Sequence, residues 1–216
     1  MKTTQKLKLN NEVTDVIYPL FKTAKSLISN DEEISTIYSY LLSQATGIER
    51  LQKIIYILDY YDKNKTLITD KKLKNQLGHG ILQIQQEFLS TYFDSTEYKY
   101  IEKSLEILTE IVNVKSGYRY ANFDLHNNET FNIHSHICKI LDDLNTQNIN
   151  DPVKTSWHVI DIILKKYISI LVNLIWHKKV GNGEITPICL RDYVTEGWQE
   201  INLESEIKSI LEKRRS

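Results

Sequence analysis

The sequence predicts an all-α protein, an up-and-down helical bundle of about five to seven helices. Apolar residues recur at helical spacing through most of its 216 residues. Three prolines and seven glycines leave little material for turns, so the elements must be few and long. A chain of this length can build one sizeable core. We therefore expect a single helical domain over 1–216, with a frayed N-terminus at 1–10, a helical bundle at 11–179, a turn or hairpin flap at 180–202 and a closing helix at 203–214.

The first part of the chain reads as two long helices. From residue 11 to Leu27, apolar residues recur at the spacing of one helix face. Asn30 then stands as an N-cap, and the three carboxylates after it suit the positive end of the next helix. That helix keeps a single apolar face for about eight turns. It is expected to end in the polar run 61–65.

Two more helices are expected before Gly117. Residues 69–88 begin with Thr-Asp and carry one apolar stripe, which indicates a single helix. Ser95 is the expected cap of the following helix, and Gly117 suits its C-terminal end. Residues 116–128 form the first long irregular stretch, and another helix is expected from about Glu129.

The most apolar helix follows a strong start signal. Asp151 supplies an N-cap side chain, and Pro152 occupies the first turn, where its missing N–H costs nothing. Further on, the glycine-rich run 180–184 indicates a turn, and β-branched residues follow around Pro187. This composition predicts a small irregular or hairpin flap near 180–195. The flap must pack on the bundle, because two isolated strands are only marginally stable.

Composition and charge exclude several classes of protein. The formal net charge of −1 gives no overall attraction to nucleic acid or to anionic membranes, so any polyanion site must be local. No run approaches the ~20 apolar residues of a membrane span, and no apolar run follows the basic N-terminus as it does in a signal peptide. Cys138 and Cys189 make no disulfide framework, and free thiols suit a reducing interior. We expect a cytoplasmic protein with no membrane partner.

Glycines within two helical segments mark a candidate site. Gly47 lies in the long second helix, and Gly78 and Gly80 lie in the next one. Glycine in a helix interior costs ~1 kcal/mol relative to alanine, so its presence indicates the close approach of a second backbone or of a ligand. We expect the two helices to meet tightly at these glycines and to leave a polar notch between them.

Two charged groups and a histidine lie beside these glycines. Glu49 and Lys53 are four residues apart in the stabilising order, which is typical of a surface ion pair. Alternatively, Glu49 is an acidic group at the helix–helix seam that faces His79. His79 can likewise be a hydrogen-bonded structural residue or a ligand-facing one. In the functional alternative, the groove near Glu49, Lys53 and His79 receives a nucleotide or a partner helix.

Residues 116–126 hold the densest cluster of functional groups. Arg119 and His126 are separated by six residues. In metal-independent ribonucleases an Arg stabilises phosphorane-like charge while a His positions or deprotonates the attacking 2′-hydroxyl. Tyr118 and Tyr120 would stack on unpaired bases. The alternative is structural: Arg119 ties the loop to a carboxylate, and the aromatic rings close one end of the bundle.

The sequence offers no convincing site for a metal or a cofactor. His134 and Cys138 share one face of a helix, whereas His136 points elsewhere, so two ligands are available where zinc needs three or four. The chain also has no Walker loop, dinucleotide fingerprint, nucleophile elbow or HExxH motif. We therefore expect no metal and no cofactor.

Three of these segments resemble signatures of HEPN-domain proteins, specifically the small prokaryotic helical group. Residues 47–53 (Gly-Ile-Glu-Arg-Leu-Gln-Lys) look like its GxERLxK-like helix, and residues 77–80 (Leu-Gly-His-Gly) look like its later LGH-like helix. Residues 118–120 (Tyr-Arg-Tyr) are similar to an aromatic-Arg-aromatic segment between later helices of that family. The resemblance covers roughly residues 35–178.

The resemblance implies an up-and-down bundle, frequent homodimers and, in many members, a metal-independent RNase with an Arg-x(4–6)-His motif. Such members often serve in toxin–antitoxin or phage-defence systems. Arg119 and His126 match the letters of that motif. Tyr120, however, stands where active members place a polar residue, and the pair falls in an expected loop rather than on a helix. We therefore expect a homodimeric, noncatalytic module that binds a nucleotide, RNA or an antitoxin-type protein partner; the alternative is an endoribonuclease that uses Arg119 and His126.

Overall fold

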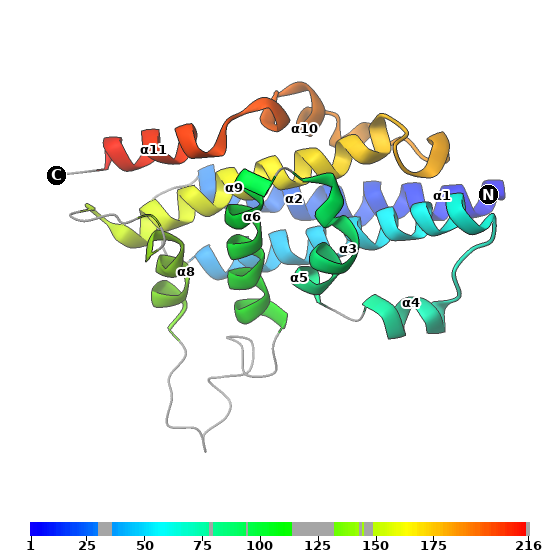
Figure 1. The fold of residues 1–216 in the computed structure, drawn as a ribbon, viewed down its shortest axis with the longest axis horizontal. Helices are drawn as coiled ribbons and strands as arrows, with labels where there is room; N and C mark the ends of the chain where they lie inside the picture. Colours follow the sequence, from blue (N-terminus) through cyan, green and yellow to red (C-terminus); the bar gives the residue numbers. More distant parts are fainter. Residues whose placement is uncertain are drawn as a thin grey trace, which may run out of the picture.

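The structure, a computed structural model, describes residues 1–29, 36–77, 80–93, 95–113, 132–142, 144 and 149–214. Within these ranges the protein is all-α, as predicted, and contains no β-strand. Figure 1 shows long helices that lie side by side and shorter helices that cross them. No helix of these ranges has the combination of length and hydropathy that spanning a bilayer requires.

The chain begins with a long rod that packs against a second one. The rod consists of α1 (Thr3–Asn11), a π-helical turn (Glu12–Ile17) and α2 (Tyr18–Ser29). α3 (Ile37–Asn64) runs back antiparallel to α2 and buries its apolar face along its whole length, as the sequence pattern predicted (Figure 1). It ends where Lys65 adopts a left-handed conformation with a φ of 56°.

The prediction that residues 1–10 are frayed is wrong. These residues are mostly helical, and their polar side chains find partners that are distant in the sequence. The Met1 amine bonds the hydroxyl of Tyr61 and lies 3.1 Å from Glu184 Oε1. Lys6 Nζ lies 2.6 Å from the other oxygen of Glu184. Local sequence gives no sign of such partners, which is why composition alone misjudged this segment.

The single helix predicted over 69–88 is divided in two. α4 (Asp70–Leu77) ends before Gly80, and α5 (Ile81–Ile84) begins after it and continues into a π-helical turn (Gln85–Leu89). Gly80 has a ψ of 89°, which is outside the helical region, so the backbone changes direction there. The apolar stripe survives the break because Leu77 and Ile81 on its two sides are both buried.

The centre of the molecule is α9 (Pro152–Trp176), which is buried on most of its surface. Asp151 caps it as predicted, since its carboxylate accepts a hydrogen bond from the Lys154 N–H at 3.1 Å. Two helices cross α9 and pack on it, namely α6 (Ser95–Leu108) and α8 (Ile133–Asp142) (Figure 1). The predicted start of α8 near Glu129 lies outside the described residues.

Two polar contacts tie α9 to its neighbours. Lys166 is only 4 % exposed, and its ammonium lies 2.5 Å from Glu97 of α6 and donates to the Ile201 carbonyl at 2.5 Å. At the next residue of α9, the Tyr167 hydroxyl lies in the core, where it accepts from Gln52 of α3 at 2.7 Å and donates to Gln85 at 2.6 Å. Buried polar groups of this kind fix how helices register against one another, because a shift would leave them unpaired.

The last part of the chain folds back along α9. Residues 180–202 are irregular, with short turns of 3-10 helix and one short α-helix, α10 (Asp192–Thr195). The hairpin alternative for this flap is wrong, because its backbone bonds are short-range ones such as Leu190 N–H to Pro187 O at 2.9 Å. The expected closing helix is confirmed as α11 (Leu203–Lys213), and Asn202 caps it by accepting from the Ser205 N–H at 2.9 Å.

Candidate functional site

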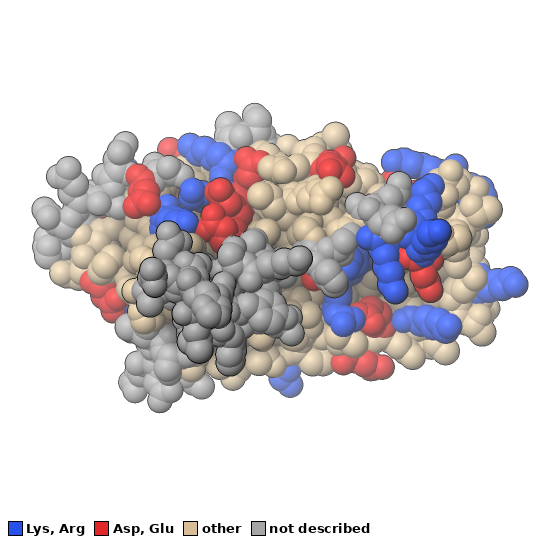
Figure 2. All heavy atoms as spheres, turned by 90° about the horizontal axis from the view of Figure 1, so that it is seen from below, with Lys and Arg blue, Asp and Glu red and all other residues tan. Residues whose placement is uncertain are grey.

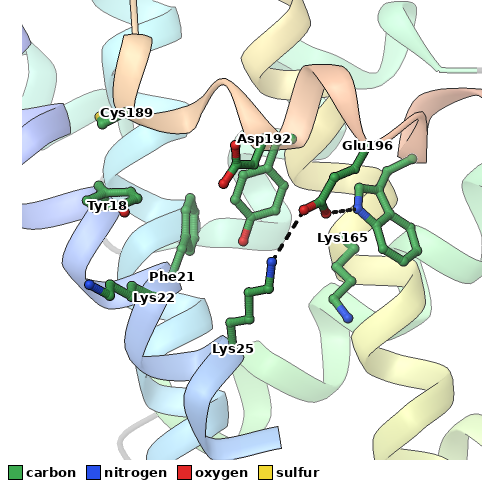
Figure 3. Close-up of a pocket in the computed structure, with 10 residues that line it drawn as sticks. Tyr18, Phe21, Lys22, Lys25, Lys165, Cys189, Asp192 and Glu196 are labelled. Atoms are coloured by element: carbon green, nitrogen blue, oxygen red, sulfur yellow. Dashed lines mark hydrogen bonds and ion pairs between the residues drawn. The ribbon is translucent and has the colours of Figure 1, made fainter. Parts of the chain in front are cut away.

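A pocket of about 220 Å³ opens between α2, α9 and the segment 188–198 (Figure 3). We call it the α2 pocket. Its lining combines aromatic rings, lysines, carboxylates and one cysteine. The lining residues are Tyr18, Phe21, Lys22, Lys25, Lys165, Cys189, Asp192, Tyr193, Glu196 and Trp198.

Gly47 determines where one wall of this pocket stands. A Cβ placed on Gly47 would overlap the ring of Phe21, so the absence of a side chain lets α2 approach α3 closely. The ring of Phe21 in turn packs against Tyr193 with 5.6 Å between ring centroids. The close approach that the sequence predicted at Gly47 therefore exists, but its partner is α2. Residues 78 and 79 of the predicted partner segment lie outside the described residues.

Glu196 organises the polar side of the pocket. Its carboxylate accepts from Trp198 Nε1 at 2.6 Å and lies 3.3 Å from Lys25 Nζ (Figure 3). The hydrogen bond from Trp198 lowers the pKa of Glu196 below its ordinary value, and Lys25 adds to that effect. Glu196 is therefore ionised at neutral pH, and it holds both the indole ring and the Lys25 ammonium in place.

On the same side of the pocket, the charge of Lys165 is neutralised by a buried carboxylate. Asp161 is 4 % exposed, and its Oδ2 lies 2.5 Å from Lys165 Nζ. The Tyr40 hydroxyl donates to Oδ1 of the same carboxylate at 2.9 Å. Burial and the nearby Asp161 raise the pKa of Tyr40, so this phenol remains a donor. Lys165 also lies 5.0 Å from the ring centre of Trp198, a cation–π distance that further fixes the indole.

Among the lysines that line the pocket, Lys22 is available to pair with a ligand. It is exposed, and it makes no ion pair or hydrogen bond with a described residue. It extends from α2 beside Tyr18, whereas Asp192 comes from the opposite segment (Figure 3). The pocket thus offers an aromatic surface with a free cation at its edge.

The described lining contains binding groups but no activated nucleophile or acid–base pair. Burial raises the pKa of the Cys189 thiol, so at neutral pH it is protonated and a poor nucleophile. No histidine is among the described residues that line the pocket. Burial and Asp161 also raise the pKa of Tyr193, which keeps that phenol neutral. The described lining therefore supplies aromatic and charged groups that can contact a ligand.

The predicted catalytic pair, Arg119 and His126, lies outside the described residues. The same is true of Tyr118, Tyr120 and His79, which were predicted to bind a ligand. Glu49 and Lys53 are described, and they form the predicted ion pair within α3 at 2.6 Å.

A second hollow lies further along α3 than the groove predicted at Glu49. It measures about 290 Å³, and residues of α3 and of the segment 77–88 line it. Tyr56 and Phe88 meet there edge to face, with 5.0 Å between ring centroids. The described lining does not include Glu49 or Lys53.

The histidines and the cysteine of α8 do not gather into a metal centre. His136 Nε2 lies 3.5 Å from Glu110, and its Nδ1 lies 3.2 Å from the Asn132 carbonyl. Burial raises the pKa of the Cys138 thiol. Among the described residues, no group of three or more His, Cys, Asp or Glu side chains is close enough to share a metal ion.

Sequence reasoning missed the α2 pocket. Its two sides come from opposite ends of the chain, since Lys25 and Glu196 are 171 residues apart. The only local signal was the unexplained set of aromatic and charged residues at 192–198. Comparison of the chain with protein-family models, curated proteins and solved structures found no match.

Proposed function

We propose that this protein is a noncatalytic binding module, HEPN-like in type, whose α2 pocket takes a ligand with a flat ring and an anionic group. A nucleoside monophosphate has that chemistry. The observation that carries the proposal is that one pocket is lined both by an indole that Glu196 holds in place, Trp198, and by Lys22, whose ammonium makes no ion pair with a described residue. The resemblance of segments 47–53 and 77–80 to HEPN signatures is a second, weaker support.

The lining suits the two halves of such a ligand. Aromatic rings provide a stacking surface, and stacking of a base on an aromatic side chain is worth about 1–3 kcal/mol. Lys22 would pair with the phosphate, as lysines do in other phosphate sites. A volume of about 220 Å³ is small for a ligand pocket, which favours a mononucleotide over a dinucleotide or a polymer.

Nucleotide titration tests the proposal directly. AMP, CMP, GMP and UMP would each be titrated into the protein while tryptophan fluorescence and the heat of binding are recorded. Trp198 lines the pocket, so a bound base should quench its emission. We expect Trp198→Leu to weaken binding about tenfold or more, and Lys22→Gln to weaken it roughly fivefold.

The control is Lys213→Gln on α11, which removes the same charge from a helix that does not line the pocket. Its affinity should equal that of the wild type. If none of the four nucleotides binds at millimolar concentration, or if the control weakens binding as much as Lys22→Gln does, the proposed ligand class is wrong.

The cellular setting is proposed on the resemblance alone. We propose a cytoplasmic homodimer that acts with a protein partner in a toxin–antitoxin or phage-defence system. Light scattering coupled to size-exclusion chromatography gives the oligomeric state. Co-expression with the products of neighbouring genes would reveal a stable partner. A monomer that co-purifies with no neighbouring product would contradict this part of the proposal.

A further inference from the structure

Lysines are concentrated at one end of the molecule. Three segments make up this end, namely residues 1–8, 59–74 and 177–184, and we call it the basic end. Together they contain ten lysines and four carboxylates, a formal charge of +6 in a chain whose overall charge is −1. The sequence excluded a global attraction to polyanions, but the fold creates a local one.

Direct contacts hold the three segments together. The Met1 amine bonds both the Tyr61 hydroxyl and Glu184, and thereby joins the first segment to the other two. Asp62 at the end of α3 accepts from the Gly181 N–H at 2.5 Å and from Asn182 Nδ2 at 2.8 Å. α4 is attached through Lys72, whose ammonium lies 4.8 Å from the ring centre of Tyr60. In Figure 1 this is the end at which the N-terminus lies.

Three of the four carboxylates at this end are engaged in internal contacts. Asp59 lies 2.8 Å from Lys63, Asp62 holds the loop at 181–182, and Glu184 holds Met1 and Lys6. Several lysines remain exposed and make no ion pair with a described residue: Lys65, Lys71, Lys74, Lys178 and Lys179. Figure 2 shows Lys and Arg side chains gathered at this end on the face seen from below.

We propose that the basic end binds a nucleic-acid strand through its phosphates. Nucleic-acid interfaces are distinguished by dense positive charge on polar surroundings, which is the character of this surface. A membrane-binding surface needs a large exposed apolar face beside its lysines. Of the described large apolar side chains, Leu7 is the one exposed within these segments. A protein interface would likewise need an apolar centre.

This site is separate from the α2 pocket. None of the residues that line the pocket belongs to the basic end. Strand binding therefore does not depend on whether the pocket takes a nucleotide, and the two proposals can fail independently.

The salt dependence of binding is the decisive measurement. A fluorescein-labelled single-stranded RNA of twenty uridines would be titrated with the protein at several salt concentrations, and its anisotropy recorded. If four lysines contact phosphates, the slope of log K against log salt should be about −3, and affinity should fall about 50-fold between 50 and 200 mM salt. The variants Lys71→Gln/Lys74→Gln and Lys178→Gln/Lys179→Gln should each flatten the slope by about 1.4 and weaken binding at least tenfold at 50 mM salt.

The matched control is Lys208→Gln/Lys213→Gln, which removes two charges from α11 at the opposite end of the molecule (Figure 1). This control should bind like the wild type, and circular dichroism should show that all variants keep their helices. Three outcomes would overturn the proposal: no RNA binding at 50 mM salt, equal weakening by the control, or binding to phosphatidylserine vesicles in place of RNA.

Discussion

Gly47 shows how a single missing side chain shapes a site that it does not itself line. Its hydrogen occupies the space that a methyl group would need against the ring of Phe21. Phe21 stands in the wall of the α2 pocket and leans on Tyr193. The glycine that the sequence marked as unusual therefore acts on the pocket through helix packing, by way of Phe21.

Replacing Gly47 should test this packing. We expect Gly47→Ala to lower the free energy of unfolding by about 1–3 kcal/mol, because a new methyl group collides with Phe21 and overpacks the α2–α3 contact. The gain in helix propensity, at most ~1 kcal/mol, offsets only part of that loss. Urea unfolding followed by circular dichroism gives the measurement.

The double variant Gly47→Ala/Phe21→Leu provides the matched comparison. Leucine removes the ring atoms that meet the new methyl group, so the double variant should be more stable than the sum of the two single changes predicts. Strictly additive effects would mean that Gly47 and Phe21 do not interact in this way.

Glu184 carries a stability contribution that should depend on pH. The hydrogen bond from Lys6, with help from the Met1 amine, lowers the pKa of Glu184 below its ordinary value. The contribution is therefore fully present above the unfolded-state pKa of about 4.3, and it is lost as the pH falls through the lower folded-state pKa. Glu184→Gln should lower the melting temperature by about 2 °C at pH 7, as for a partly exposed ion pair.

The same variant should match the wild type at acid pH. Once the carboxyl group is protonated, glutamine and glutamic acid differ little in charge, so the two melting temperatures should converge as the pH falls below the lowered folded-state pKa of Glu184. Glu204→Gln at an exposed position of α11 is the control, because Glu204 has no ion pair with a described residue. A difference at Glu184 that persists unchanged at low pH would rule out this electrostatic cause.

At the scale of elements, the helices that local patterns predicted are those whose ends are encoded locally. α9 begins at Asp151 and Pro152 because a cap and a fixed φ act within one turn. The sequence pattern did not predict the break at Gly80, because the apolar stripe continues across it. Hydrophobic periodicity reports which residues are buried and does not report a change in helix direction. The helix over 3–11 was missed for the opposite reason, since its partners at Tyr61 and Glu184 are distant in sequence.

The contact of Lys166 with Glu97 should hold α6 and the end of the flap against α9. We expect Lys166→Met to destabilise the fold by about 1–3 kcal/mol, because the Glu97 carboxylate loses its ammonium partner while it is still 22 % exposed, which places this ion pair between surface and buried ones. Glu97 also accepts from the Leu203 N–H at 3.2 Å, so the start of α11 should loosen as well. Chemical denaturation and amide hydrogen exchange at the start of α11 would report the two effects.

The double variant Lys166→Met/Glu97→Leu separates the loss of a partner from the loss of packing. It removes both charges together, so it should recover much of the stability that Lys166→Met loses. Equal destabilisation of the single and double variants would show that the unpaired carboxylate is not the cause.

At the scale of the whole molecule, the fold brings charged and aromatic side chains together at two sites that local sequence patterns do not predict. The α2 pocket joins residues near 20 to residues near 195, and the basic end joins three segments that span most of the chain. The fold class could be predicted because burial repeats with the helical period. The site could not, because it depends on which helix faces meet, and periodicity does not contain that information. Of the residues that the sequence selected, Glu49 and Lys53 proved to be an ion pair on the helix.

The proposed noncatalytic role predicts that the protein binds RNA without cleaving it. The described lining of the α2 pocket has no histidine and no low-pKa thiol, and the positive charge of the basic end, which also contains His177, is carried by lysines. We therefore expect a labelled single-stranded RNA to remain intact on a denaturing gel after incubation with excess protein in EDTA, for the wild type and for His126→Ala alike. The alternative, a metal-independent endoribonuclease, predicts fragments with the wild type that disappear in both His126→Ala and Arg119→Ala. RNA that is bound but stays intact would support a noncatalytic RNA-binding protein. Cleavage by the wild type that is lost in both variants would instead identify residues 119 and 126 as the catalytic pair of a ribonuclease.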